Sequence, residues 1–144
     1  MRRIIFRALV ACCVLSGGAV AAWSQSEAGP IKSSPAYAEV LLRKTEIQSD
    51  LEALVADYTE TNPKIVDLRA ELRSLDKLLE RIYSVKPSET SKLTLALGRL
   101  IVRRAALETE LTRLSRSYTK DQNEVKRATK RIEIFDAAIN DILK

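Results

Sequence analysis

The stretch Asp57-Tyr58-Thr59-Glu60-Thr61-Asn62-Pro63-Lys64 lies between two runs of regularly spaced leucines. Pro63 lacks a backbone donor, clashes with the preceding helical turn and disfavours the helical conformation at Asn62. Asn62 also carries a side chain that can end one helix and cap the next. The stretch therefore predicts either a kink within one long helix or a boundary between two helices.

Residues on both sides of this stretch follow a seam with alternating spacings of four and three, without a slip. This is the heptad pattern of a helical coiled coil, and charged residues occupy the flanking positions. Because the phase is kept across Pro63, we favour one kinked helix. The seam positions, most of them apolar, are Val40, Lys44, Ile47, Leu51, Leu54, Tyr58, Thr61, Ile65, Leu68, Leu72, Leu75, Leu79 and Ile82.

A shift of sixty residues places this pattern on a second copy. The offset keeps the aliphatic positions and also several polar and aromatic ones, which two unrelated heptad helices would not share. The sequence therefore predicts an internal duplication, with repeats at about 40–83 and 100–143. The non-aliphatic matches are Arg43 with Arg103, Lys44 with Arg104, Tyr58-Thr59 with Tyr118-Thr119, and Asp76 with Asp136.

Residues 84–90 interrupt the seam, because Pro87 cannot continue a helix and Ser88 or Thr90 can cap the next one. We therefore expect an all-α fold, a long antiparallel helical hairpin (a coiled coil) with arms of about 50 residues and roughly 75 Å. Its first arm is kinked or broken near Pro63. Its second arm continues through residues 121–123, which contain no proline. A three-helix bundle is the alternative if Pro63 separates two helices.

The first 24 residues have the order of a secretory signal peptide. Arg2 and Arg3 precede an uncharged, largely apolar run at 8–23, and cleavage fits after Ala21 or Ser24. That run is shorter than the roughly 20 residues that span a bilayer, which disfavours a membrane anchor. A lipoprotein box ending at Cys12 is a further, weaker interpretation. We expect a periplasmic or secreted protein without a transmembrane span in the mature chain.

Removal of residues 1–24 changes the charge and the cysteine content. The chain has 24 basic and 19 acidic residues, and three of the arginines lie in this segment, so the mature chain has a net charge of +2. This balance argues against a nucleic-acid partner. Both cysteines are removed as well. Residues 25–35 then form a flexible linker, and Ser34-Pro35 marks the start of a helical domain at 36–144.

The charges of the two arms are opposite in sign. Residues 39–81 hold ten acidic and seven basic side chains, whereas residues 99–131 hold ten basic and four acidic ones. Opposite signs help the arms to select each other or a second subunit. Because a two-helix hairpin buries only one stripe per helix, we expect a protein partner or a homo-oligomer formed through the coiled coil.

The sequence offers no chemistry of its own. It has no histidine, no glycine-rich phosphate loop and no nucleophile elbow, so we expect no catalytic, cofactor or metal site and no enzyme. The tyrosines on the seam are typical of core packing with the hydroxyl at the rim. The candidate kink or interaction residues are Tyr58, Asn62, Pro63 and Tyr118.

The stretch from Leu51 to Leu79 resembles the periplasmic coiled coil of polysaccharide chain-length determinant and exopolysaccharide export proteins. There, too, a leucine-spaced helix reaches a Tyr-Thr, then an Asn-Pro or His-Pro, and then a further heptad helix. The resemblance covers about 30 residues, and the two membrane spans and the kinase part of that family have no counterpart here. It implies a detached coiled-coil piece that works with an export assembly.

The expected function is therefore that of an exported structural or adaptor coiled coil of the cell envelope, associated with polysaccharide export. The alternative is a periplasmic holdase chaperone, which would share the signal peptide, the size and the helical arms. Holdases of that kind grow from a β-containing body, and no strand-like run lies between Gln25 and Tyr37 to build one.

Overall fold

The computed structural model describes residues 28–144, and every regular element in that range is a helix. The all-α class is thus confirmed. The predicted signal peptide at 1–24, with Cys12 and Cys13, lies outside the described residues. The elements are α1 (Ala28–Lys32), α2 (Pro35–Val55), α3 (Pro63–Tyr83), the short 3-10 helix η1 (Pro87–Lys92), α4 (Leu95–Leu114) and α5 (Asn123–Leu143).

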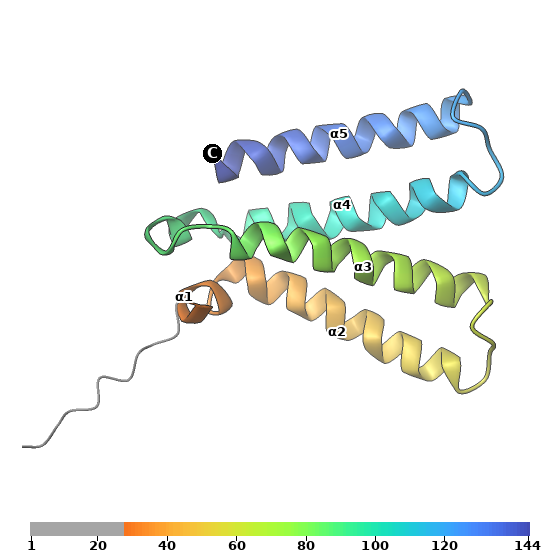
Figure 1. Cartoon of the computed structure of the whole chain (residues 1–144), viewed down its shortest axis with the longest axis horizontal. Coiled ribbons are helices and arrows are strands. Elements are labelled where there is room, and N and C mark those ends of the chain that lie inside the picture. The colour runs from red at the N-terminus through yellow and green to blue at the C-terminus, as the bar shows by residue number, and fades with distance from the viewer. Residues whose placement is uncertain (1–27) are drawn as a thin grey trace, which may run out of the picture.

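The four long helices form two antiparallel hairpins, α2–α3 and α4–α5 (Figure 1). Helix α4 lies against both α2 and α3, whereas α5 packs chiefly on α4. The hairpin turns, at residues 56–62 and 115–122, lie at the same end of the molecule. Helix α1, η1 and the C-terminus lie at the opposite end, so the molecule has a turn end and a terminal end.

The prediction of one long helix in the second arm is wrong, because a turn divides each arm. For the first arm, predicted to be kinked or broken near Pro63, the break is confirmed. Helix α2 ends at Val55 and α3 begins at Pro63, so the first arm is broken and not kinked. The second arm breaks at the corresponding place without a proline. Its turn is rich in serine, threonine and aspartate, whose side chains compete for backbone hydrogen bonds, as Ser115 does with the Leu111 carbonyl (2.8 Å). With four long helices, the three-helix alternative is wrong as well.

Three of the long helices begin with a side chain that caps the first turn, a bond worth about 1 kcal/mol each. The predicted start at Ser34-Pro35 and the capping role of Asn62 are confirmed, while Thr94 takes the place of Ser88 or Thr90. Gln122, before α5, makes no such bond. The capping bonds run from the amides of Tyr37, Lys64 and Leu97 to Ser34 (3.3 Å), Asn62 (2.9 Å) and Thr94 (3.3 Å).

Part of the predicted linker at 25–35 is helical, because α1 falls within it. Ile31 is only 6% exposed and joins the core, and Ser34 Oγ donates to the Ile31 carbonyl at 2.6 Å. Burial of Ile31 thus holds in place a segment for which Gly29 and Pro30 had indicated flexibility. The connection between the hairpins runs from the end of α3 to the start of α4 and contains η1.

The core thins toward the turn end. The main cluster joins α1, α2, α3 and α4 with the last turns of α5, where Ile139 is fully buried. Near the turns, the seam residues Leu51, Leu54, Leu111 and Leu114 are only partly buried. Each fully buried aliphatic side chain contributes about 1.5–3 kcal/mol. Stability is therefore concentrated at the terminal end, and the turn end is the more open part.

The helix bounds follow the sixty-residue offset. Helices α3 and α5 begin and end sixty residues apart, and α2 and α4 begin sixty residues apart. Each hairpin also holds an ion pair at the same position, Lys44 with Asp76 and Arg104 with Asp136. Positions in the two hairpins therefore correspond structurally as well as in sequence, and their origin by duplication remains a prediction.

Candidate interaction site

The four predicted residues lie at the turn end, but they do not form one site. Asn62 and Pro63 begin α3 and have a local role. Tyr58 and Tyr118 are 55% and 44% exposed in their turns, so the expected packing of these tyrosines in the seam is wrong. Their helices have already ended, and the rings therefore do not reach the core. Two large aromatic side chains thus remain accessible.

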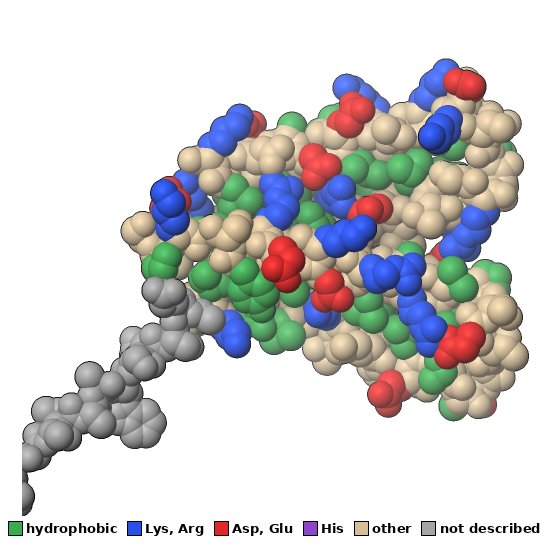
Figure 2. Space-filling model, viewed as in Figure 1, with side chains coloured by type: hydrophobic (Ala, Val, Ile, Leu, Met, Phe, Trp, Pro, Cys, Tyr) green, Lys and Arg blue, Asp and Glu red, His purple; other side chains and the backbone are tan. Residues whose placement is uncertain are grey.

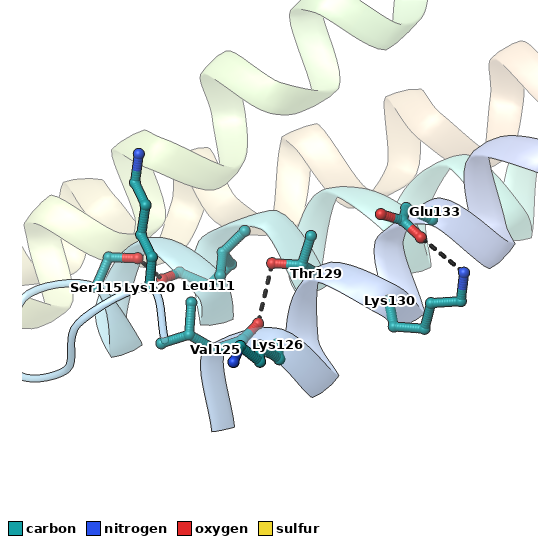
Figure 3. A pocket seen from close by; sticks show the side chains of 8 residues that line it. All are labelled: Leu111, Ser115, Lys120, Val125, Lys126, Thr129, Lys130 and Glu133. Atoms are coloured by element: carbon teal, nitrogen blue, oxygen red, sulfur yellow. Dashed lines mark hydrogen bonds and ion pairs between the residues drawn. The ribbon is translucent and has the colours of Figure 1, made fainter. Parts of the chain in front are cut away.

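A groove of about 540 Å³ opens beside the second turn, between α4 and α5 (Figure 3). Its apolar floor includes Leu111 and the buried Val125. Figure 2 shows apolar side chains in the furrow between these two helices. Thr129 donates to the Val125 carbonyl at 2.9 Å, so its hydroxyl is already satisfied. The remaining lining residues are Ser115, Lys120, Lys126, Lys130 and Glu133.

The corresponding walls of the first hairpin are bridged by an ion pair. Sixty residues before Lys120 and Thr129 stand Glu60 and Arg69, and Arg69 Nη2 lies 2.7 Å from Glu60 Oε1. Lysine and threonine cannot form this pair. The second hairpin is therefore left unbridged at the place where the groove opens.

The groove has a surplus of positive charge. Lys130 pairs with Glu133 at 2.9 Å, on the same helix. Within residues 28–144, Lys120 and Lys126 form no ion pair with any side chain. An apolar floor with two unpaired ammonium groups favours a ligand that offers both apolar and acidic side chains.

Arg104 is the centre of a polar cluster between α3, α4 and α5. It binds both carboxylate oxygens of Asp136, at 3.2 and 3.3 Å, and it also pairs with Glu108. Ser74 donates to Glu108 from α3 at 2.5 Å. Arg81 Nη1 also lies 3.6 Å from Asp136 Oδ1, so two guanidinium groups balance two carboxylates. We therefore assign the cluster a structural role in fixing the register of the helices. A charged residue on the apolar seam was the only sequence signal for it.

A second partly buried pair joins α2 to α3. Glu71 is only 7% exposed and accepts from Arg43 Nε at 2.8 Å. The hydrogen bond to Glu71 raises the pKa of Arg43, partly opposed by burial, so the Arg43 guanidinium stays protonated at neutral pH. Sequence reasoning placed Arg43 in the repeat but did not predict its partner.

Three ion pairs join the first hairpin to the second, and one of them links Arg81 Nη1 to Asp136 Oδ1 at 3.6 Å. Arg116 Nη2 lies 2.8 Å from Asp67 Oδ1, and Arg99 Nε lies 3.9 Å from Glu39 Oε1. Asp67 Oδ1 is buried and accepts no hydrogen bond, so the charge of Arg116 compensates it. In these two pairs the acid belongs to the first hairpin, as the opposite charge of the two halves predicts, whereas in the pair of Arg81 with Asp136 it belongs to the second.

At the terminal end, Tyr37 and Tyr83 pack with ring centroids 6.0 Å apart and planes tilted by 53°. The Tyr37 hydroxyl, followed by burial, raises the pKa of Tyr83. The Tyr83 hydroxyl therefore stays neutral near neutral pH, and the two rings contribute packing between α2 and α3.

Two further features are absent from the part of the chain that the structure describes. Residues 28–144 contain no group of three or more Asp or Glu side chains arranged to hold a metal ion. None of the helices described combines the length and the apolar character that a membrane span requires. Among the described residues, the groove beside the second turn is the main candidate site.

Comparisons with protein-family models, with curated proteins and with solved structures found no match to this chain.

Proposed function

We propose that this chain is an exported, non-enzymatic helical adaptor of the cell envelope that binds one protein partner at its turn end. The observation that carries this proposal is the groove beside the second turn, with its apolar floor of Leu111 and Val125 and its unpaired Lys120 and Lys126. The exposed Tyr118 in the adjoining turn adds an aromatic contact of the kind that interfaces favour.

The partner expected from this surface is a helical segment with one apolar stripe and acidic flanks. The apolar stripe would lie on the groove floor, and carboxylates would pair with the two lysines. Export rests on the signal-peptide pattern of residues 1–24. The resemblance of residues 51–79 to chain-length determinant coils makes a polysaccharide export assembly the first place to look for the partner.

Site-specific photo-crosslinking in the cell envelope tests the proposal. A photo-reactive residue at position 129, in the groove, should yield adducts dominated by one envelope protein. The same residue at position 69, the corresponding site of the first hairpin, is the matched control and should capture that protein far less. Lys120→Glu combined with Lys126→Glu should remove most of the adduct at 129.

Equal capture from positions 69 and 129, or adducts that persist in the doubly reversed variant, would contradict the proposal. So would a chain retained in the cytoplasm with residues 1–24 uncleaved. Circular dichroism of each variant shows whether the helices are kept, so that a loss of binding is not confused with a loss of folding.

A holdase chaperone is the second candidate, favoured by the large apolar side chains that stand exposed away from the groove. Leu42 is 58% exposed and Val55 is 43% exposed. A holdase would give many different adducts at both crosslinking positions and would suppress the aggregation of an unfolded outer-membrane protein. A single dominant adduct and no effect on aggregation would remove this candidate.

A further inference from the structure

Within the chain, α4 lies against α2 and α3 through one apolar face. Gly98, Ile101 and Ala105 on this face are buried, and the latter two are fully inaccessible. The contact is close at Gly98, where an added Cβ would lie 2.8 Å from the Glu39 Cβ. This packing is the joint between the two hairpins.

The corresponding face of α2 is not covered by any described residue. Sixty residues before Gly98, Ile101 and Ala105 stand Ala38, Leu41 and Thr45, and all three are exposed. The contrast is largest between Ile101, which is 0% exposed, and Leu41, which is 45% exposed. The next residue, Leu42, is 58% exposed. Helix α2 thus presents the same kind of apolar face that α4 buries.

The surface of α3 on which α4 packs has a counterpart on α5. On α3, Ser74 is 4% exposed because α4 covers it. Sixty residues later, Ile134 is 59% exposed, the most exposed large apolar side chain of α5. None of Arg127, Arg131 and Ile134 lines the groove of Figure 3, so this is a separate surface.

We propose that copies of this chain stack side by side in a head-to-tail series, with α2 of one copy lying on α4 and α5 of the next. The arrangement would repeat the packing of α4 on α2 and α3 within each chain. Leu41 and Leu42 would lie where Ile101 and Val102 lie in the internal joint, and Ile134 would be covered. The occupant of both uncovered faces is therefore a second copy of the same chain.

The charges of the two faces are complementary in this register. In the internal joint, Asp67 and Glu110 line one surface cleft together. Their counterparts are Arg127 and Asp50, two exposed residues of opposite charge that form no ion pair elsewhere in residues 28–144. The intermolecular contact would bring these two side chains together, where the internal joint has two carboxylates and relies on nearby arginines.

Two further contacts fit the same register. Glu71 and Ala106 line a second cleft of the internal joint, and their counterparts are Arg131 and Glu46. Glu39 and Arg99 are counterparts of each other, so their ion pair would also form between copies. There Glu39 on α2 of one copy would meet Arg99 on α4 of the next. Each of these positions is at the rim, so the charges would fix the register more than the affinity.

The stacking also agrees with how helical repeats gain stability. A helical pair that contacts only its neighbours gains much of its buried apolar area from stacking, and arrays commonly need at least three pairs. This chain supplies two hairpins. A head-to-tail contact of this kind is not closed by two-fold symmetry, so it predicts chains of several copies, or a ring if the rotation closes.

Sedimentation velocity of the purified exported protein over a wide concentration range tests the proposal. The parent protein should form a ladder of oligomers as its concentration rises. Leu41→Lys should weaken association by about tenfold or more, because it places an unpaired charge at the centre of the joint. Leu95→Lys is the matched control, since Leu95 is similarly exposed (43%) but lies outside both faces, and it should associate like the parent.

A charge exchange tests the register independently of the apolar contact. Arg127→Asp and Asp50→Arg should each weaken association, whereas an equimolar mixture of the two variants should restore it, because each altered face then meets its altered counterpart. A parent protein that stays monomeric would overturn the proposal. So would a Leu41→Lys variant that associates as tightly as the parent, or a mixture that associates no better than the single variants.

Discussion

In the first hairpin, Glu60 and Arg69 bridge the space beside the turn, whereas in the second hairpin Lys120 and Thr129 leave the corresponding space open. The helices on either side begin at corresponding positions in both cases. The same backbone plan therefore carries a closed surface in one half and an open, basic groove in the other. The difference lies in side chains at these and neighbouring positions, such as Lys126, which corresponds to Val66, and not in the helix bounds.

At the joint between the hairpins the roles are exchanged, because there the second hairpin has the covered surface and the first hairpin has the open one. Helix α4 hides its apolar face against α2 and α3, while α2 keeps the corresponding face exposed. One position can thus be core in one hairpin and surface in the other. Paired substitutions at corresponding positions measure how much each environment contributes.

The largest expected difference is between Ile101→Ala and Leu41→Ala. Ile101 is fully buried, so its truncation should lower the free energy of unfolding by about 2–5 kcal/mol. Leu41 is 45% exposed, and its truncation should change that free energy by about 0.5 kcal/mol in a protein kept dilute enough to be monomeric. Urea denaturation followed by circular dichroism measures both. Equal losses would mean that the two faces are buried alike.

The next largest difference concerns the close approach at Gly98. A Cβ there would lie 2.8 Å from the Glu39 Cβ and 2.9 Å from the Ala36 carbonyl oxygen. Gly98→Val should therefore destabilise the protein by about 1–3 kcal/mol through overpacking, even though valine favours a helix slightly more than glycine does.

The matched control for that substitution is Ala38→Val, at the corresponding exposed position of α2. It should cost only the difference in helix propensity, up to about 0.7 kcal/mol. Thermal unfolding of the two variants side by side measures the difference. A Gly98→Val variant as stable as the control would show that α2 and α4 are not tightly joined.

A smaller difference is expected at the starts of α3 and α5. Asn62 accepts a hydrogen bond from the Lys64 amide, whereas Gln122 caps nothing. Asn62→Ala should cost about 1 kcal/mol, and Gln122→Ala should stay within about 0.5 kcal/mol of the parent. Gln122→Asn should stabilise the protein if the turn can adopt the capped geometry. Equilibrium unfolding in urea distinguishes these outcomes, and equal effects of the two alanines would contradict the assignment.

The smallest expected effect is on the stability of the folded protein at acidic pH. The hydrogen bond from Lys92 lowers the pKa of Glu89 from its ordinary value of 4.5, and Gly29, sixty residues earlier, has no carboxylate. A lowered folded-state pKa adds stability above the unfolded value, and this stability is lost as the pH falls through the folded value. The Glu89→Gln variant should therefore be less stable than the parent at neutral pH, and its stability should fall less than that of the parent as the pH drops below 4.5. A parallel decline of both proteins would contradict this assignment.

The heptad spacing predicted the helices and most of the core correctly, because an apolar stripe is needed wherever a helix packs. It could not distinguish a long arm from a hairpin. The turn at residues 56–62 interrupts the helix without shifting the phase of the stripe, so Ile65 and Leu68 continue the count as if no break existed. The absence of proline near residue 123 was equally uninformative, since polar turn residues suffice to end α4.

The groove was beyond the reach of single-sequence reasoning for a related reason. Its floor and its lysines come from two helices whose pairing depends on a turn that the seam did not reveal. The sixty-residue offset held the missing signal, because Glu60 and Arg69 differ in character from Lys120 and Thr129. To predict that Leu41 and Ile134 are exposed, in contrast, one must know the order in which the helices pack and not only which helices pair.

The close contact at Gly98 also has a mechanical consequence. It lies near the terminal end, where a bond from the Ala36 amide to the Leu93 carbonyl (3.2 Å) further fastens α2 to the segment before α4. From Gly98 to Leu114 the helix extends about 24 Å, so a rotation of about 10° at this contact displaces the second turn by about 4 Å. A small rotation at the fastened end would thus be amplified at the turn end, where the ion pair of Arg116 with Asp67 (2.8 Å) is the contact that would resist it.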